Sequence, residues 1–96
     1  MKEEVKREIE TLIDGLELDC STNEFQDKGN WYNISWNQTL SEDFIREFQD
    51  KVDWICISCK QTLSEKFIKE FQDKVCWDHI SRYQTLGENF IEEFQK

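Results

Sequence analysis

The sequence predicts an all-α fold: a small α/α solenoid of three 23-residue two-helix repeats behind an N-terminal capping helix. The tripeptide Glu-Phe-Gln recurs every 23 residues, centred on Phe25, Phe48, Phe71 and Phe94, and a period of about 20 to 50 residues is typical of stacked supersecondary units. Within each unit the apolar residues follow the i, i+1, i+4 spacing of a helix and not the alternation of a strand. The 96 residues include no proline, which also favours helix.

The length fits a single domain over residues 1–96, because compact domains typically hold about 100 to 200 residues. Three copies of the repeat begin at Asn30, Asp53 and Cys76. The domain is therefore predicted to consist of a capping helix over 1–16, a degenerate half repeat over 17–29, and repeats over 30–52, 53–75 and 76–96.

Each repeat is predicted to form two short helices, as the second copy illustrates. Asp53 is a good N-cap for a helix over about Trp54–Lys60, and Ser64 can cap a second helix over about Glu65–Asp73. Cys76 takes the first capping position in the third copy, where a thiol caps poorly. Helices this short are unstable alone, so packing between repeats must stabilise them.

The two ends of the chain depart from the repeat. The N-terminal segment places its apolar residues on one stripe of a charged helix that ends near Asp14 and Gly15. The segment 18–28 resembles a shortened second helix, with Asp19 in the place of the capping serine. The last helix, over about 88–95, has no following repeat to cover it, so it is a possible surface for a homo-oligomer.

The first helix of each repeat divides into a constant and a varying face. Trp31, Ile34, Ser35 and Gln38 have identical counterparts in all three copies, and their spacing puts them on one face, which we expect to be packed. The opposite face varies, either by drift at solvated positions or because it binds a partner. Large aromatic residues are typical of interface hot spots, and the predicted partner-binding residues are Tyr32, Asn33, Trp36, Asn37, Ile55, Lys60, Asp78, His79, Arg82 and Tyr83.

The charge restricts the class of partner. Twelve Lys and Arg against 21 Asp and Glu give a net charge of −9, which opposes direct binding to nucleic acid or to an anionic membrane. Residues 1–48 carry a net charge of −7 and residues 49–96 only −2. We therefore expect a basic protein partner, or else acidity that serves solubility alone. Neither a signal peptide nor a transmembrane segment is evident, which predicts a cytoplasmic, reducing environment.

Four residues could carry chemistry. Cys56, Cys59, Cys76 and His79 form the string C-x2-C-x16-C-x2-H, which looks like a Cys3His zinc site. Cys56 and His79 are, however, equivalent positions on neighbouring helices, about 9 to 10 Å apart in ordinary packing, so no cofactor is expected, with zinc as the alternative. Cys76 and His79 could also form a nucleophile pair. Without a third group, a phosphate motif or room for a pocket, we expect no enzyme.

The repeat unit, W-x-x-I-S-x-x-Q-T-L-S-E-x-F-I-x-E-F-Q-D-K-V, resembles a short helical-hairpin repeat family of giant DNA viruses and some bacteria. The resemblance covers residues 25 to 96. It departs from the family pattern at Gly29, Cys76 and Gly87, which affects the helix caps and the hydrophobic contacts beside them. The family implies helical stacking and protein binding, and it implies no catalytic residue.

These observations lead to three functional hypotheses. The first is a non-enzymatic protein-binding module, an acidic inhibitor of a basic nucleic-acid-binding effector (anti-defence or anti-CRISPR type), by analogy with phage inhibitors of defence nucleases. The alternative is a structural or adaptor repeat protein that self-associates. The third is a regulator whose fold is stabilised by a bound zinc ion.

Overall fold

The protein is all-helical in the part of the chain that its computed structural model describes, residues 2–84 and 87. This confirms the predicted all-α class, and the described residues form no strand. The helices are α1 (Glu3–Gly15), α2 (Phe25–Lys28), α3 (Trp31–Asn37), α4 (Glu42–Glu47), α5 (Trp54–Lys60), α6 (Glu65–Glu70) and α7 (Trp77–Tyr83).

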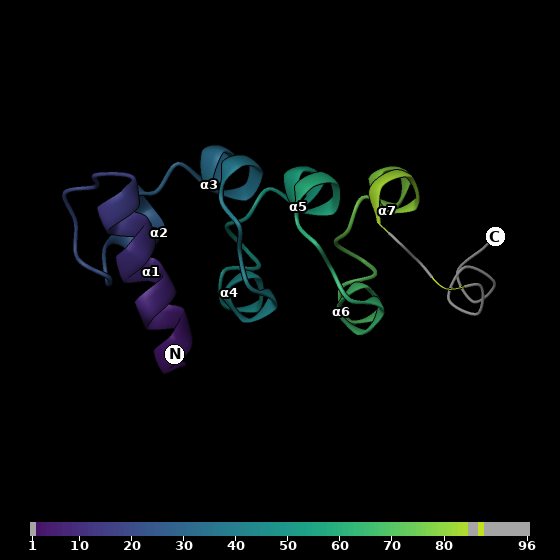
Figure 1. The fold of residues 1–96 in the computed structure, drawn as a ribbon, viewed down its shortest axis with the longest axis horizontal. Coiled ribbons are helices and arrows are strands. Elements are labelled where there is room, and N and C mark those ends of the chain that lie inside the picture. Colours follow the sequence, from purple (N-terminus) through teal and green to yellow (C-terminus); the bar gives the residue numbers. More distant parts are fainter. Residues whose placement is uncertain (1, 85–86, 88–96) are drawn as a thin grey trace.

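The helices form two rows that run along the 46 Å longest axis of the molecule (Figure 1). The first helices of the repeats, α3, α5 and α7, lie side by side in one row. The second helices, α4 and α6, form the other row. Helix α1 lies at the N-terminal end, where it packs against α4.

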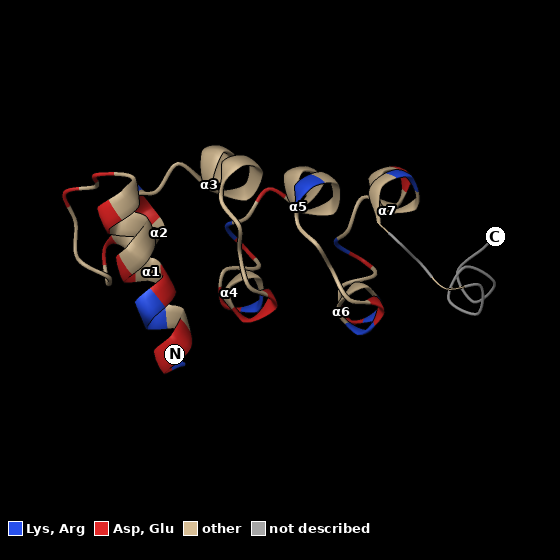
Figure 2. Ribbon diagram, in the orientation of Figure 1, with Lys and Arg blue, Asp and Glu red and all other residues tan. Residues whose placement is uncertain are grey.

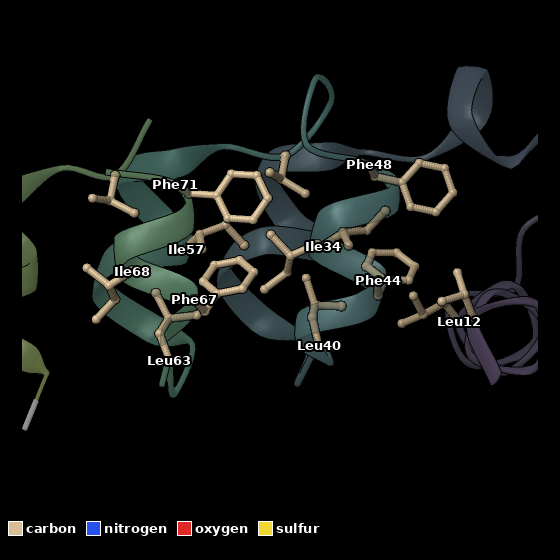
Figure 3. Close-up of a cluster of buried hydrophobic side chains, with 14 of the residues drawn as sticks. Leu12, Ile34, Leu40, Phe44, Phe48, Ile57, Leu63, Phe67, Ile68 and Phe71 are labelled. Atoms are coloured by element: carbon tan, nitrogen blue, oxygen red, sulfur yellow. The ribbon is translucent and has the colours of Figure 1, made fainter. Parts of the chain in front are cut away.

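The core lies between the two rows and repeats with the sequence. Phe44 and Phe67 are fully buried at equivalent positions of α4 and α6, and Ile34 and Ile57 are fully buried at equivalent positions of α3 and α5 (Figure 3). Leu12 of α1 points into the same cluster. The repeated residues are therefore the ones that pack between helices, as the short helix lengths require.

The predicted caps begin the helices. Asn30 and Asp53 accept hydrogen bonds at the starts of α3 and α5, and Ser41 and Ser64 do so at the starts of α4 and α6. Cys76 makes no side-chain cap hydrogen bond at the start of α7. Each cap satisfies a backbone N–H that has no partner within its own helix.

Two side chains of the constant face connect successive repeats. Ser35 Oγ accepts a hydrogen bond from the backbone N–H of Asp53 (3.0 Å). The amide nitrogen of Gln61 donates to the carbonyls of Ser35 (3.1 Å) and Gln38 (2.7 Å), and its oxygen accepts from the N–H of Leu40 (2.9 Å). Gln61 thereby satisfies three backbone groups of the preceding repeat, including carbonyls at the end of α3.

The next repeat uses the same bonds. Ser58 Oγ accepts from the N–H of Cys76 (2.9 Å), and Gln84 bonds to the carbonyls of Ser58 and Gln61 and to the N–H of Leu63. These polar residues of the constant face are the same in each repeat because they make the hydrogen bonds that join successive repeats. Buried polar side chains are costly when they lack partners, and within the described residues no buried side-chain nitrogen or oxygen atom lacks a hydrogen-bond partner.

A glutamate joins the second row of helices in the same way. Glu42 of α4 accepts from both the N–H and the hydroxyl of Ser64, at 2.7 and 3.1 Å. In the first repeat, Glu8 of α1 accepts the two corresponding bonds from Ser41, at 3.0 and 2.6 Å. Helix α1 therefore supplies the glutamate that a preceding repeat would have supplied, which is the role expected of a capping helix.

The second helices are shorter than predicted: α6 ends at Glu70 and not at Asp73. The backbone leaves the helical conformation at Phe71, with φ −111° and ψ 30°. The carbonyl of Phe71 then accepts bonds from the N–H groups of both Lys74 and Val75, which forms a turn. This turn places Val75 in the core, where it is buried.

The segment 18–28 also differs from the prediction. Its helix α2 covers only Phe25–Lys28, and Asp19 begins no helix. The local start is at Ser21, whose N–H and hydroxyl both donate to the carboxylate of Glu24 at 3.1 Å. These bonds lower the pKa of Glu24. Residues 16–18 close the end of α1, where Glu17 and Leu18 bond back to it, and Asp19 follows directly without beginning a helix.

Helix α1 ends as predicted at Gly15, but glycine does not make its left-handed cap. Glu17 adopts that conformation, with φ 55°. The N–H groups of Glu17 and Leu18 bond to the carbonyls of Asp14 and Ile13, which is the hydrogen-bond pattern of a Schellman motif.

The predicted last helix, over 88–95, and the self-association surface placed on it lie outside the described residues. No helix in the described ranges is both long enough and apolar enough to cross a membrane.

Candidate protein-binding surface

The varying positions of the first helices mostly lie on the outside of the row. We use the name helix-A face for the predicted binding residues on α3, α5 and α7. Nine of its ten members are exposed and His79 is half-buried; the members are Tyr32, Asn33, Trp36, Asn37, Ile55, Lys60, Asp78, His79, Arg82 and Tyr83. The constant residues Ile34 and Ser35 are fully buried. The two faces are therefore separated as the sequence predicts.

An aromatic pair occupies the α3 end of the helix-A face. Tyr32 is 61% exposed and Trp36 is 37% exposed. Their rings are stacked nearly parallel, with centroids 6.4 Å apart. The side chain of Lys60, which comes from α5, places its Nζ 4.3 Å from the centre of the Trp36 ring. This cation–π contact joins the surfaces of α3 and α5 and holds the Trp36 ring in place.

The α7 end carries a second aromatic pair. Tyr83 is 57% exposed, and its ring stacks on His79 with centroids 6.1 Å apart. Between the two pairs, Ile55 of α5 is 56% exposed. Large apolar side chains thus occur on all three helices of the row, so the helix-A face offers one anchor or more per repeat.

Charge is distributed differently from the aromatic residues. Helix α3 contains no charged residue, and the helix-A face carries Lys60, Asp78 and Arg82 on its other two helices. The acidic residues lie instead on α1, on the segment around α2 and on the second row of helices, where Lys and Arg accompany them (Figure 2). The acidic N-terminal half and the aromatic face are therefore two distinct surfaces and not one.

One ion-pair chain crosses the second row. The carboxylate of Asp43 pairs with Lys2 at 3.2 Å and with Arg46 at 2.9 Å, and Arg46 also pairs with Glu70 at 3.0 Å. The hydrogen bond from Lys2, and then its charge and that of Arg46, hold the pKa of Asp43 below its usual value. These ion pairs connect Lys2, at the start of α1, to α4 and α6.

The four residues of the zinc-like string are not assembled into a metal site. Within residues 2–84 and 87, no three His, Cys, Asp or Glu side chains are placed to hold a metal ion. Cys56 is buried, and burial, with the nearby Asp53 charge, raises the pKa of its thiol to about 11. Cys59 is half-buried, and burial, together with the neighbouring Cys76, raises its pKa. Cys56 therefore departs from its equivalents in the other repeats, the exposed Asn33 and the half-buried His79.

Cys76 and His79 do meet. The Sγ of Cys76 lies 3.0 Å from Nδ1 of His79, across one turn at the start of α7. The pairing that their spacing predicts is therefore present. The ring of Tyr83 stacks on the imidazole, so the neighbour that orients His79 is aromatic and not the acidic residue of a catalytic triad.

One feature of the surface, a hollow beside α1, is not predicted by the sequence. An open hollow of about 500 Å³ lies between α1 and the segment that follows it, with Glu10, Asp14, Glu17 and Cys20 in its lining. Its two walls come together through the left-handed turn at Glu17. Glutamate is not a residue that signals such a turn, so no local pattern predicts the hollow.

Comparisons with protein-family models, with curated proteins and with solved structures found no match. The resemblance to the giant-virus and bacterial repeat family therefore stays a prediction from the repeat motif itself.

Proposed function

We propose that the protein is a non-enzymatic protein-binding module that engages its partner through the helix-A face. The observation that carries this proposal is the exposure of Tyr32, Trp36, Ile55 and Tyr83 at positions that vary between repeats. Stacking between repeats does not require these side chains, since the packed positions are constant. Tyrosine and tryptophan are enriched among the residues that contribute most to binding energy.

The aromatic anchors are held in place before binding. Tyr32 and Trp36 stack on each other, and Lys60 covers the Trp36 ring. Tyr83 is held in the same way by His79. An ordered side chain loses less conformational entropy when a partner immobilises it, which favours affinity.

The acidic surface supports a basic partner. With a net charge of −9 and acidic residues on α1, around α2 and on the second row, the long-range field attracts a basic protein. The sharper form of the proposal is an inhibitor that occupies a basic nucleic-acid-binding effector. In this form the acidic surface accelerates the encounter, and the helix-A face supplies the short-range contacts.

Capture from a lysate of the source cell tests the proposal. The bait variant carries Tyr32→Ala, Trp36→Ala, Arg82→Ala and Tyr83→Ala. A control variant changes four exposed residues elsewhere without altering net charge, Glu47→Ala, Lys51→Ala, Lys66→Ala and Asp73→Ala. We expect the wild type and the control to retain one protein that the face variant loses, with circular dichroism showing that all three fold.

The salt dependence of capture distinguishes the general proposal, binding through the helix-A face, from its sharper form, inhibition of a basic nucleic-acid-binding effector. If charge steers a basic partner, capture weakens as salt concentration rises, because exposed charges are screened. Capture that is insensitive to salt contradicts the basic-effector form and leaves the helix-A face as the binding surface. Equal capture by the wild type and the face variant contradicts the general form.

A further inference from the structure

One pair of reactive groups, Cys76 and the helix-A-face residue His79, carries a chemistry that the proposed binding function does not use. Cys76 takes the capping position that Asn30 and Asp53 hold in the other repeats, and its side chain caps no backbone N–H. Its Sγ instead lies 3.0 Å from Nδ1 of His79. The ring of Tyr83 stacks on the imidazole, with centroids 6.1 Å apart. A thiol and an imidazole at this distance can exchange a proton.

A second thiol lies on the neighbouring helix. The backbone N–H of Cys76 donates to Ser58 Oγ at 2.9 Å, and Cys59 is the next residue after Ser58 along α5. Cys59 and Cys76 are both half-buried, so neither is sealed from small reagents. Burial, and after it the charge of Cys76, raises the pKa of Cys59.

We propose that Cys76 is a thiol-modification site for low-molecular-weight disulfides, assisted by His79, and that Cys59 resolves the adduct into a Cys59–Cys76 bond between α5 and α7. The inference concerns the isolated protein and does not rest on any partner.

The two steps balance as thiol–disulfide exchange. Nδ1 of His79 takes the proton of Cys76, and the thiolate attacks one sulfur of the small disulfide; the disulfide bond breaks and one small thiolate leaves. The thiolate of Cys59 then attacks the Cys76 sulfur of the mixed disulfide, its own proton going to solvent, and a second small thiolate leaves. Two protein thiols are oxidised and one small disulfide is reduced to two thiols. Once Cys76 is capped, its charge no longer opposes ionisation of Cys59.

The other cysteines serve as internal references. Cys56 is buried, and its pKa is raised to about 11, so it is expected to react slowly because the thiolate is the nucleophile. Cys20 is half-buried like Cys76 and lines the hollow beside Glu10 and Asp14. Cys20 therefore serves as a reference thiol at similar burial, and His79→Asn isolates the contribution of His79.

Reaction of the folded protein with the aromatic disulfide dithionitrobenzoate tests the proposal. The release of coloured thiolate gives the rate, peptide mapping by mass spectrometry gives the site, and the urea-unfolded protein gives the reference rate of each cysteine. The variants are His79→Asn, Cys59→Ser and Cys76→Ser. Asparagine is the natural residue at the equivalent position 33, so His79→Asn is compatible with the repeat.

We expect Cys76 to react first, at least about tenfold faster than Cys20 relative to the unfolded reference, and His79→Asn to remove about that factor. The wild type is expected to release two thiolates in succession and to yield the Cys59–Cys76 cross-linked peptide, whereas Cys59→Ser keeps a stable adduct on Cys76. First reaction at Cys20 or Cys59, or an unchanged rate in a folded His79→Asn, overturns the site. A wild-type adduct on Cys76 that never yields the cross-link overturns the role of Cys59.

Discussion

Single residues at helix ends contribute to the stability of the individual helices. Asp53 accepts hydrogen bonds from two N–H groups at the start of α5, whereas Cys76 accepts none at the start of α7. At the end of α1, Glu17 adopts a left-handed conformation that glycine adopts more easily. Both helix ends are therefore less stable than other residues at these positions would make them.

Replacing the thiol cap with the residue of the preceding repeat should stabilise the protein. Cys76→Asp supplies a carboxylate at the start of α7, and we expect the free energy of unfolding to rise by about 1 kcal/mol. Removal of the existing cap of α5 by Asp53→Ala should lower the free energy of unfolding by about 1 kcal/mol. Urea unfolding followed by circular dichroism measures both. A Cys76→Asp variant less stable than the wild type would mean that the contact with His79 is worth more than a cap.

Glycine at position 17 should also stabilise the protein. A left-handed conformation costs a residue with a Cβ roughly 1 to 2 kcal/mol, while glycine adds unfolded-state entropy, so we expect Glu17→Gly to gain about 0.5 to 1 kcal/mol. Gly15 is the last residue of α1, and a Cβ added there would meet no atom within 4 Å, so Gly15→Ala should gain a similar amount. Thermal unfolding of the two variants checks these signs. A loss of stability in Glu17→Gly would contradict the assigned backbone conformation.

Between neighbouring helices, the repeats are joined by buried polar side chains as well as by the apolar core. Gln61 satisfies one N–H and two carbonyls of the preceding repeat and is itself buried. Ser35 and Ser58 each accept a bond from the backbone N–H of the residue that begins the next repeat. These bonds explain why a polar residue can be constant on a packed face.

Truncating the bridging glutamine should cost several times more than truncating another glutamine. Gln61→Ala leaves buried backbone groups without partners, and we expect a loss of about 2 to 4 kcal/mol in the free energy of unfolding. Gln49, half-buried, makes one bond to the carbonyl of Arg46, and Gln49→Ala should cost under about 1 kcal/mol. Denaturant unfolding of both variants gives the comparison. Equal losses would show that the bridge between repeats does not contribute specifically.

Acid should weaken the ion-pair chain between α1 and α4. The pKa of Asp43 is lowered in the folded state by Lys2 and Arg46, so its contribution is fully present above the unfolded-state value of about 3.9 and is lost as pH falls through the lower folded-state value. We expect the free energy of unfolding to decrease as the pH falls below about 5. Asp43→Asn should make this decrease shallower. Unfolding curves at several acidic pH values test the effect. A pH dependence unchanged by Asp43→Asn would contradict it.

The parts of the fold that could be predicted from the sequence are those set by local signals. The starts of α5 and α6 follow from Asp53 and Ser64, and the buried stripe follows from helical spacing. Other parts depend on tertiary context: α6 ends early because Phe71 closes a turn that buries Val75. For the candidate site, exposure of the varying face was predictable, while the burial of Cys56 and the cation–π contact of Lys60 with Trp36 required the stacking of two helices.

Across the whole molecule, stability and the proposed recognition are assigned to different surfaces. Constant residues face the core and the joints between repeats, acidic residues lie on α1, around α2 and on the second row, and large variable side chains lie on the helix-A face. A repeat built in this way can change its outer residues without disturbing the stack, because stability in such proteins depends on contacts within and between neighbouring repeats.

Site-specific photo-crosslinking in the source cell can show directly whether a partner binds the helix-A face. A photoreactive phenylalanine analogue replaces Tyr32 or Tyr83 on the helix-A face, and Lys66 on the second row serves as the control. We expect both face positions to cross-link to the same protein and position 66 not to do so. Cross-links to that protein from position 66 alone, or from a face position only to a second copy of this chain, would contradict the assignment of the helix-A face as the binding surface.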